Sequence, residues 1–372
     1  MALAAPARVY RLGARTVTVG MGKNRPCPVP GLPGARDNET EPFLRWPSSN
    51  WHKSGEQTEF GVIRMLSKAF SRPEFLNPSW EEQIETALAG DERQRLALAR
   101  RLADEAYHHP ECEKANARSE QRNFYLDHDR VTDRAVLLLH GWSACPFEMR
   151  ELGERLHRTG LNVVGPRLAG HGTRVEDFAC STAEDWWAAA RQGLAIAALS
   201  GRSVVIVGES MGGSLAVLLA QAFPNLIQQL ILCAPCFEIA NPLAGVTRLP
   251  PVRWLMPRFA MGPLPEWMHG YWYPVLPTSA VAQLVRIAVA SRRTGPVMTR
   301  PIVIIQADED QMVRPGGAHH YFHSLSRLPE SEKRLIAFSG GHHNLTVALN
   351  PQKERVFEWI LDAIREREVA SR

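Results

Sequence analysis

The sequence lacks any run of about eighteen apolar residues, the length that a membrane-spanning helix needs. It also lacks a dense run of lysine and arginine, and its net charge is only +4 over 372 residues. These two absences predict no integral membrane segment and no nucleic acid partner. Cysteine is scarce, and its six residues are scattered along the chain, which is typical of buried thiols in a reducing compartment. We therefore expect a cytoplasmic protein, and the hydrophobic share of 45% indicates a globular chain with a sizeable core.

Residues 1–61 are rich in proline, glycine and arginine and show no sustained hydrophobic period, so we expect an irregular or disordered leader. Residues 1–20 contain no acidic side chain and no continuous apolar core of the kind that a secretory signal has. An organelle-targeting segment, a basic disordered leader and an extension upstream of a true start at Met65 all fit this composition. Residues 62–122 have a helical pattern that is interrupted at Gly90, and they predict a helical N-terminal appendage.

Strand and helix patterns alternate from residue 123 onward. The predicted strands cover residues 124–126, 135–139, 161–164, 203–207, 230–233, 301–306 and 334–338, and the predicted helices cover 148–158, 184–198, 214–223 and a final segment that starts near residue 350. This alternation predicts a mostly parallel sheet with helices on both faces, built from residues 123–236 and 301–372. Functional sites in such sheets lie at the carboxyl ends of the strands.

One segment, residues 237–300, breaks this alternation. It is too long for a simple crossover and is rich in proline, tryptophan, methionine and tyrosine. We expect it to form a cap inserted into the sheet domain, with one clear helix at residues 280–290.

The sequence Gly208-Glu209-Ser210-Met211-Gly212 fits the G-x-S-x-G pattern of a nucleophile elbow. An apolar strand precedes it and an apolar helix follows it, which is the context that this motif requires. Glycines on either side of the serine permit the tight turn. Ser210 is therefore the predicted nucleophile, and the backbone N–H of Met211, at a helix N-terminus, is a predicted oxyanion donor.

A serine nucleophile needs a base and an acid that orients the base. For the acid we favour Asp310, in the loop after the strand at 301–306, with Asp308 and Glu309 in the same loop as alternatives. For the base we favour His342, which follows two glycines after the strand at 334–338, and we interpret His343 as a neighbour. The order Ser, Asp, His along the chain is the order expected for this elbow.

A second oxyanion donor is expected from the loop after the strand at 135–139. That strand ends in His140-Gly141-Trp142, so the backbone N–H of Trp142 is the predicted donor, and His140 is expected to brace the loop through hydrogen bonds. We predict no metal site, because His319 and His323 share one helix face but no third ligand accompanies them.

With these residues the chain resembles the α/β-hydrolase superfamily, and within it the bacterial carboxylesterase and monoacylglycerol-lipase-like group. The resemblance runs from about Ala135 to the final helix and rests on the motifs at 139–142, 166–173 and 208–213 together with the Asp310 and His342 loops. It implies an α/β-hydrolase fold and hydrolysis of carboxylic esters without a cofactor. It also implies that His171, in the 166–173 motif, is part of the scaffold.

The predicted function is therefore that of a serine hydrolase that cleaves small-molecule esters with an apolar acyl group through an acyl-enzyme. Hydrolysis of amide or carbon–carbon bonds, acyl transfer, and ligand binding without catalysis are the alternatives. Contact of the apolar cap with a lipid surface is compatible with the sequence. The natural substrate, the substrate-binding residues and the oligomeric state are left open.

Overall fold

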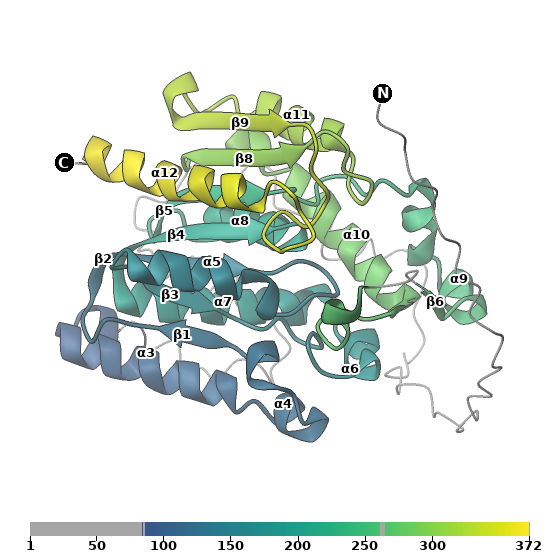
Figure 1. Cartoon of the computed structure of the whole chain (residues 1–372), viewed down its shortest axis with the longest axis horizontal. Coiled ribbons are helices and arrows are strands. Elements are labelled where there is room, and N and C mark those ends of the chain that lie inside the picture. Colours follow the sequence, from purple (N-terminus) through teal and green to yellow (C-terminus); the bar gives the residue numbers. More distant parts are fainter. Residues whose placement is uncertain (1–83, 85, 261–264, 372) are drawn as a thin grey trace, which may run out of the picture. The chain divides into compact units, whose positions relative to one another are not determined.

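The computed structural model describes residues 84, 86–260 and 265–371, all of which belong to one compact unit of the chain. Its centre is a seven-stranded sheet in the order β1-β3-β2-β4-β5-β8-β9 (Figure 1). The strands are β1 (Phe124–Leu126), β2 (Thr132–Leu139), β3 (Asn162–Gly165), β4 (Gly201–Glu209), β5 (Ile227–Cys233), β8 (Ile302–Ala307) and β9 (Lys333–Phe338). Within this sheet only β1 pairs antiparallel, with β3, so the predicted mostly parallel sheet is confirmed.

Alternate side chains of the central strands pack into two hydrophobic cores, one on each face of the sheet. Leu137, Ile206 and Leu232 point into one core, whereas Val136 and Val205 point into the other. Both faces of these strands are buried, which explains their continuous apolar, β-branched sequence. Because these strands are parallel, their carboxyl ends lie at one common edge of the sheet, and the loops that follow them meet there.

Helices cover both faces, as predicted. Figure 1 shows α5 (Phe147–Arg158) and α12 (Lys353–Ser371) along one face, and their buried residues belong to the same core as Val136. The other face is covered by α7 (Ala183–Ser200) and α8 (Met211–Ala222), while α3 (Glu92–Tyr107) packs on α7. The remaining helices of the sheet domain and its N-terminal side are α4 (Pro110–Ala115), η3 (Ser119–Gln121), α6 (Val175–Cys180), α11 (Pro315–Ser324) and η7 (Glu330–Glu332).

The predicted break at Gly90 is present, because Asp91 caps α3 by accepting a hydrogen bond from the N–H of Gln94 at 2.8 Å. The leader at residues 1–61 and the first part of the appendage lie outside the described residues. None of the helices in the described part of the chain combines the length and the apolar character that crossing a bilayer requires.

The segment 237–300 lies between β5 and β8 and has its own small sheet of β6 (Arg258–Ala260) and β7 (Val275–Pro277). Its longest helix, α10 (Thr278–Arg292), contacts α8 and α6. Its other elements are η4 (Pro242–Arg248), α9 (Pro250–Leu255), η5 (Glu266–Met268) and η6 (Gly295–Val297).

Candidate active site

The turn between β4 and α8 holds Ser210 in a conformation that is rare for a residue with a side chain. Its φ is 53° and its ψ is −115°, a strained geometry typical of a nucleophile elbow. The turn is so tight that a Cβ on Gly208 would lie 2.5 Å from the carbonyl oxygen of Gly212. The start of α8 also packs so closely against the end of β2 that a Cβ on Gly212 would lie 2.1 Å from the carbonyl oxygen of Leu139. The predicted strand, turn and helix are therefore present, although α8 begins at Met211 and includes both glycines that the helical pattern left out.

The structure corrects the predicted base: His343, and not His342, lies against Ser210. The Nε2 atom of His343 is 2.8 Å from Ser210 Oγ, and its Nδ1 atom is 2.8 Å from Asp310 Oδ2. His342 is exposed, whereas the His343 side chain is only 12% exposed. The chain passes close over the strand ends at Gly341, where a Cβ would lie 2.6 Å from the Phe338 ring. Of the two histidines that follow, one is exposed and the other contacts Ser210, and no residue pattern distinguished them.

Asp310 is the acid that the structure brings to this histidine. Its Oδ1 atom accepts hydrogen bonds from the backbone N–H groups of Met312 and Val313, at 2.9 and 3.0 Å. Burial opposes ionisation of the carboxyl, but the hydrogen bond and charge of His343 and these two N–H groups hold the pKa of Asp310 below its ordinary value. Since an ionised carboxylate only accepts hydrogen bonds, Nδ1 of His343 carries the proton and Nε2 is free to accept one from Ser210.

The two alternative acids in the same loop have other contacts. Asp308 accepts a hydrogen bond from Ser339 Oγ at 3.1 Å, and Glu309 accepts one from the N–H of Gly340 at 3.0 Å. Both side chains are exposed. They attach the acid loop to the histidine loop and do not contact His343 in this arrangement.

The loop after β2 lies directly beside the serine. A Cβ on Gly141 would lie 3.4 Å from Ser210 Cβ, which places the peptide between Gly141 and Trp142 next to the nucleophile. Met211 is the first residue of α8, so its N–H has no acceptor within the helix. The structure thus brings the loop of Trp142 and the N-terminus of α8 next to Ser210, and these are the two elements from which the oxyanion donors are predicted.

His140 braces this loop, as expected. Its Nε2 atom accepts a hydrogen bond from the N–H of Leu168 at 3.1 Å, so its Nδ1 carries the proton and donates to the carbonyl of Gly141 at 2.9 Å. Burial lowers the pKa of His140 to about 4, which keeps the ring neutral at neutral pH. The buried His171 packs edge-on against the His140 ring and has a scaffold position.

The N-terminal appendage supports the same loops from outside. Arg167 Nη1 lies 2.9 Å from Glu111 Oε2 of α4, and the same Oε2 accepts a hydrogen bond from the N–H of Gly170 at 3.1 Å. The Arg167 side chain is only 3% exposed, so Glu111 provides a charge partner for a nearly buried guanidinium. Residues before the sheet domain therefore help to hold the 166–173 motif.

Two functional candidates escaped the sequence analysis, namely the buried acids Glu148 and Glu209. Glu148 lies on the buried face of α5 in line with Leu152 and Leu156, at a spacing of four residues. Glu209 ends a strand whose preceding side chains are apolar and buried. Both residues could have been found in the sequence, because each is an acidic residue at a position where the regular hydrophobic pattern predicts a buried apolar side chain.

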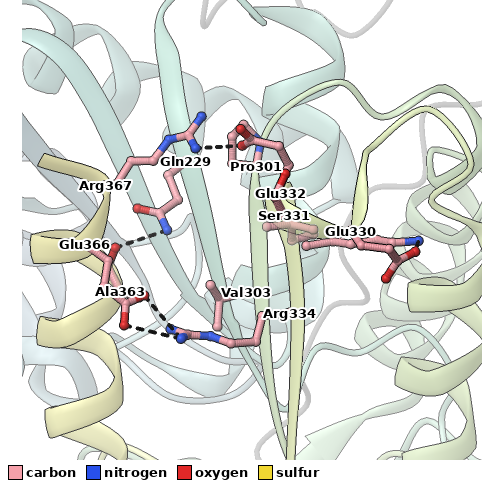
Figure 2. Close-up of a pocket in the computed structure, with 12 residues that line it drawn as sticks. Gln229, Pro301, Val303, Glu330, Ser331, Glu332, Arg334, Ala363, Glu366 and Arg367 are labelled. Atoms are coloured by element: carbon pink, nitrogen blue, oxygen red, sulfur yellow. Dashed lines mark hydrogen bonds and ion pairs between the residues drawn. The ribbon is translucent and has the colours of Figure 1, made fainter. Parts of the chain in front are cut away.

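The described residues include no group of three or more histidine, cysteine or acidic side chains with metal-binding geometry. A cavity of about 340 Å³ opens at the far end of the sheet, beneath the first residues of β8 and β9 and beside α12 (Figure 2). Its charged side chains pair with one another, as Arg334 does with Glu366 and Arg367 with Glu332. Because it lies at the amino ends of the strands, this cavity is separate from the site of Ser210.

The fold and this arrangement define a class of protein. The model of the alpha/beta hydrolase family matches residues 136–357, and the chain belongs to that family. It is similar to the thermostable monoacylglycerol lipase of Bacillus sp. (strain H-257), with 30% identity over 236 residues that cover 60% of this chain and 87% of the relative.

Two further likenesses agree with this membership. The carboxylesterase of Bacillus subtilis (strain 168) is 33% identical over 105 residues, which cover 28% of this chain and 42% of the relative. A solved structure from work on LipS and LipT, two metagenome-derived lipolytic enzymes, aligns with a TM-score of 0.59 at 28% identity, covering 66% of this chain and 97% of that one. The predicted resemblance to the carboxylesterase and monoacylglycerol-lipase-like group is thereby confirmed.

Proposed function

We propose that the protein is a serine hydrolase that cleaves carboxylic esters with an apolar acyl group through an acyl-enzyme intermediate. The observation that carries the proposal is the hydrogen-bonded line from Ser210 Oγ through His343 to Asp310, with 2.8 Å at each step. The relatives named as a lipase and a carboxylesterase support an ester as the bond that is cleaved.

In the proposed mechanism, Nε2 of His343 takes the proton of Ser210 as Oγ attacks the ester carbonyl carbon. Asp310 keeps the opposite ring nitrogen protonated and stabilises the imidazolium that forms. The backbone N–H groups of Trp142 and Met211 stabilise the oxyanion. His343 then donates the proton to the leaving alcohol, and a water molecule, deprotonated by the same histidine, releases the acid. This scheme uses no cofactor.

The segment 237–300, which we interpret as a cap, supports an apolar acyl group. Val281 and Val285 of α10 form a buried cluster against which the Trp142 side chain packs. Met268 and Trp272 pack with Val347 of the loop that follows His343 in a second cluster. Apolar side chains of this segment thus border two of the proposed catalytic loops, where they favour an aliphatic or aromatic acyl chain over a charged one.

The same segment exposes apolar side chains that fit contact with an anionic lipid surface, where apolar esters concentrate. Trp254 is 82% exposed and Leu255 is 69% exposed, and the half-buried Arg253 lies next to them in α9. Sedimentation with vesicles that contain phosphatidylglycerol tests this contact. Substitution of Trp254 and Leu255 by serine is expected to reduce the bound fraction, and unchanged binding would exclude this surface.

The test of the proposed function is hydrolysis of a p-nitrophenyl ester series, from acetyl to palmitoyl, by the wild type and by Ser210→Ala. Loss of activity in the variant supports the mechanism, and the preferred chain length reports the depth of the acyl pocket. Equal rates in both proteins would refute the role of Ser210. Labelling with a fluorophosphonate distinguishes a catalytic protein from a binding-only relative, and product analysis with a competing alcohol or an amide substrate distinguishes the other reactions.

A further inference from the structure

Two buried carboxyl groups lie directly behind the proposed catalytic residues. Glu148, at the start of α5, is 1% exposed, and Glu209, the residue before Ser210, is not exposed at all. The catalytic scheme above gives neither of them a role. Two acids at such depth need a physical reason, because burial strongly disfavours the charged form.

Glu148 joins two of the catalytic loops. Its Oε2 atom accepts a hydrogen bond from the backbone N–H of Gly141 at 2.6 Å, and its Oε1 atom accepts one from the side-chain amide of Asn344 at 2.9 Å. Gly141 precedes the proposed oxyanion donor, and Asn344 follows the histidine. One carboxyl group thus fixes the position of the oxyanion loop relative to the histidine loop.

Glu209 holds the next two residues of the histidine loop. It accepts a hydrogen bond from the N–H of Leu345, and its Oε2 atom bonds to the hydroxyl of Thr346. That hydroxyl also lies 3.3 Å from the main-chain carbonyl oxygen of Glu148. A hydroxyl has only one proton to donate, so if it donates to the carbonyl, the proton between Thr346 and Glu209 belongs to Glu209.

The surroundings of the pair favour one shared negative charge. Among the described residues, the hydrogen-bond partners of the two carboxyl groups are backbone N–H groups, an amide and a hydroxyl, and none of these partners is a lysine or an arginine. The titratable groups that face the pair are His343, Cys145 from the oxyanion loop and Cys233 from β5, in addition to each other. Of these groups only His343 can carry a positive charge that offsets a negative charge on the pair. Asp310, on the opposite side of the His343 ring, already carries a negative charge.

Burial raises the pKa of both carboxyl groups, and the charge of Glu148 raises that of Glu209 further. The hydrogen bonds from Gly141 and Asn344 and the nearby His343 oppose the rise at Glu148. Two like charges in one buried site do not both ionise near neutral pH. The proton is therefore expected on Glu209.

We propose that Glu148 and Glu209 share a single negative charge, which resides on Glu148, and that Glu148 is a positioning residue that holds the oxyanion loop and the histidine loop in register with Ser210. This inference rests on the proposed function. Its charge also faces His343 and stabilises the imidazolium that forms when Ser210 attacks. Glu209 acts as a neutral hydrogen-bonding group.

The test compares two isosteric variants, Glu148→Gln and Glu209→Gln, in ester hydrolysis over a range of pH. For Glu148→Gln we expect kcat to fall by about 10- to 100-fold, the effect of losing a charged hydrogen-bond acceptor, with KM changed less than about threefold. The acid limb of its pH profile should move to lower pH, because His343 loses a neighbouring negative charge. For Glu209→Gln we expect a smaller fall in kcat than for Glu148→Gln and an unmoved acid limb, because an amide can replace a neutral carboxyl group as a hydrogen-bonding partner. The matched control is Glu154→Gln, an exposed glutamate of the same helix as Glu148, which should leave kcat within about twofold.

If Glu148→Gln does not fold, a second variant tests the same contact. Asn344→Ala removes the histidine-loop contact but leaves the carboxylate, and we expect kcat to fall about tenfold with an unmoved acid limb. Folded variants at Glu148 or Asn344 with wild-type kcat would overturn the inference, and so would a larger effect at Glu209 than at Glu148. If hydrolysis by the wild type does not depend on Ser210, the proposed function fails first; if it does, only the inference on Glu148 is at stake.

Discussion

The Nε2 atom of His343 and the Oγ atom of Ser210, 133 positions apart in the sequence, lie 2.8 Å from each other. Ser210 follows β4 and His343 follows β9, and the parallel sheet brings both strand ends to the same edge. The contact therefore depends on the topology of the sheet as much as on the two side chains. It also decides between two adjacent histidines that the sequence presents as equivalent.

The first prediction separates these histidines. His343→Ala should lower kcat for a p-nitrophenyl ester by roughly 10⁴- to 10⁶-fold, because Ser210 loses its base. His342→Ala should change kcat by less than about threefold, because that side chain is exposed and makes no contact with Ser210. Both variants should keep the wild-type melting temperature within a few degrees. An inactive His342→Ala beside an active His343→Ala would restore the assignment made from sequence.

The second prediction concerns the acid. Asp310→Asn keeps the shape of the side chain but no longer fixes the proton on Nδ1 of His343, so kcat should fall by about 10⁴-fold. The control is Asp308→Asn in the same loop, where only the contact with Ser339 changes and less than a threefold effect is expected. The measurement is the single-turnover rate of ester cleavage. Comparable losses in both variants would indicate a general disturbance of the loop.

The sequence predicted the elements of the core well, because each is long, apolar and regular. Ser210 was predicted as the nucleophile because its strand, turn and helix are contiguous in the sequence, and Asp310 was predicted as the acid because it lies in the loop after a buried strand. The choice between His342 and His343 depends on how one loop packs over Phe338, which no local pattern encodes. The contacts of Glu148 come from residues that are remote in sequence, so only the folded chain reveals them.

The third prediction follows from the raised pKa of Glu209. The folded protein holds this proton at pH values where the unfolded chain, with an ordinary glutamate pKa of about 4.3, has lost it. The stabilisation is therefore complete below about pH 4 and is lost as the pH rises toward the folded-state pKa. Glu209→Gln removes this titration, so its free energy of unfolding relative to the wild type should increase with pH.

Urea unfolding at about pH 4, 6.5 and 9 measures this difference. The control is Glu154→Gln, an exposed glutamate of α5 in a surface ion pair with Arg150, which should give a difference close to zero at each pH. If the free energies of unfolding of Glu209→Gln and the wild type change equally with pH over this range, Glu209 does not hold a proton in the folded state.

The fourth prediction tests the turn that presents Ser210. A Cβ at Gly212 would lie 2.1 Å from the carbonyl oxygen of Leu139 and 2.8 Å from that of His140, and neither backbone group can move without shifting the oxyanion loop. Gly212→Ala should therefore destabilise the protein by about 3 kcal/mol or more and abolish ester hydrolysis even in the fraction that folds. Gly316→Ala in α11 is the matched substitution, because a Cβ there meets no atom within 4 Å. The Gly316→Ala variant should be more stable than the wild type by about 0.5 kcal/mol, since alanine loses less backbone entropy in a helix than glycine does.

Thermal unfolding measures the stability of both variants, and fluorophosphonate labelling measures the activity of the folded fraction. A Gly212→Ala variant that is stable and reacts with the label would show that the turn does not need this glycine.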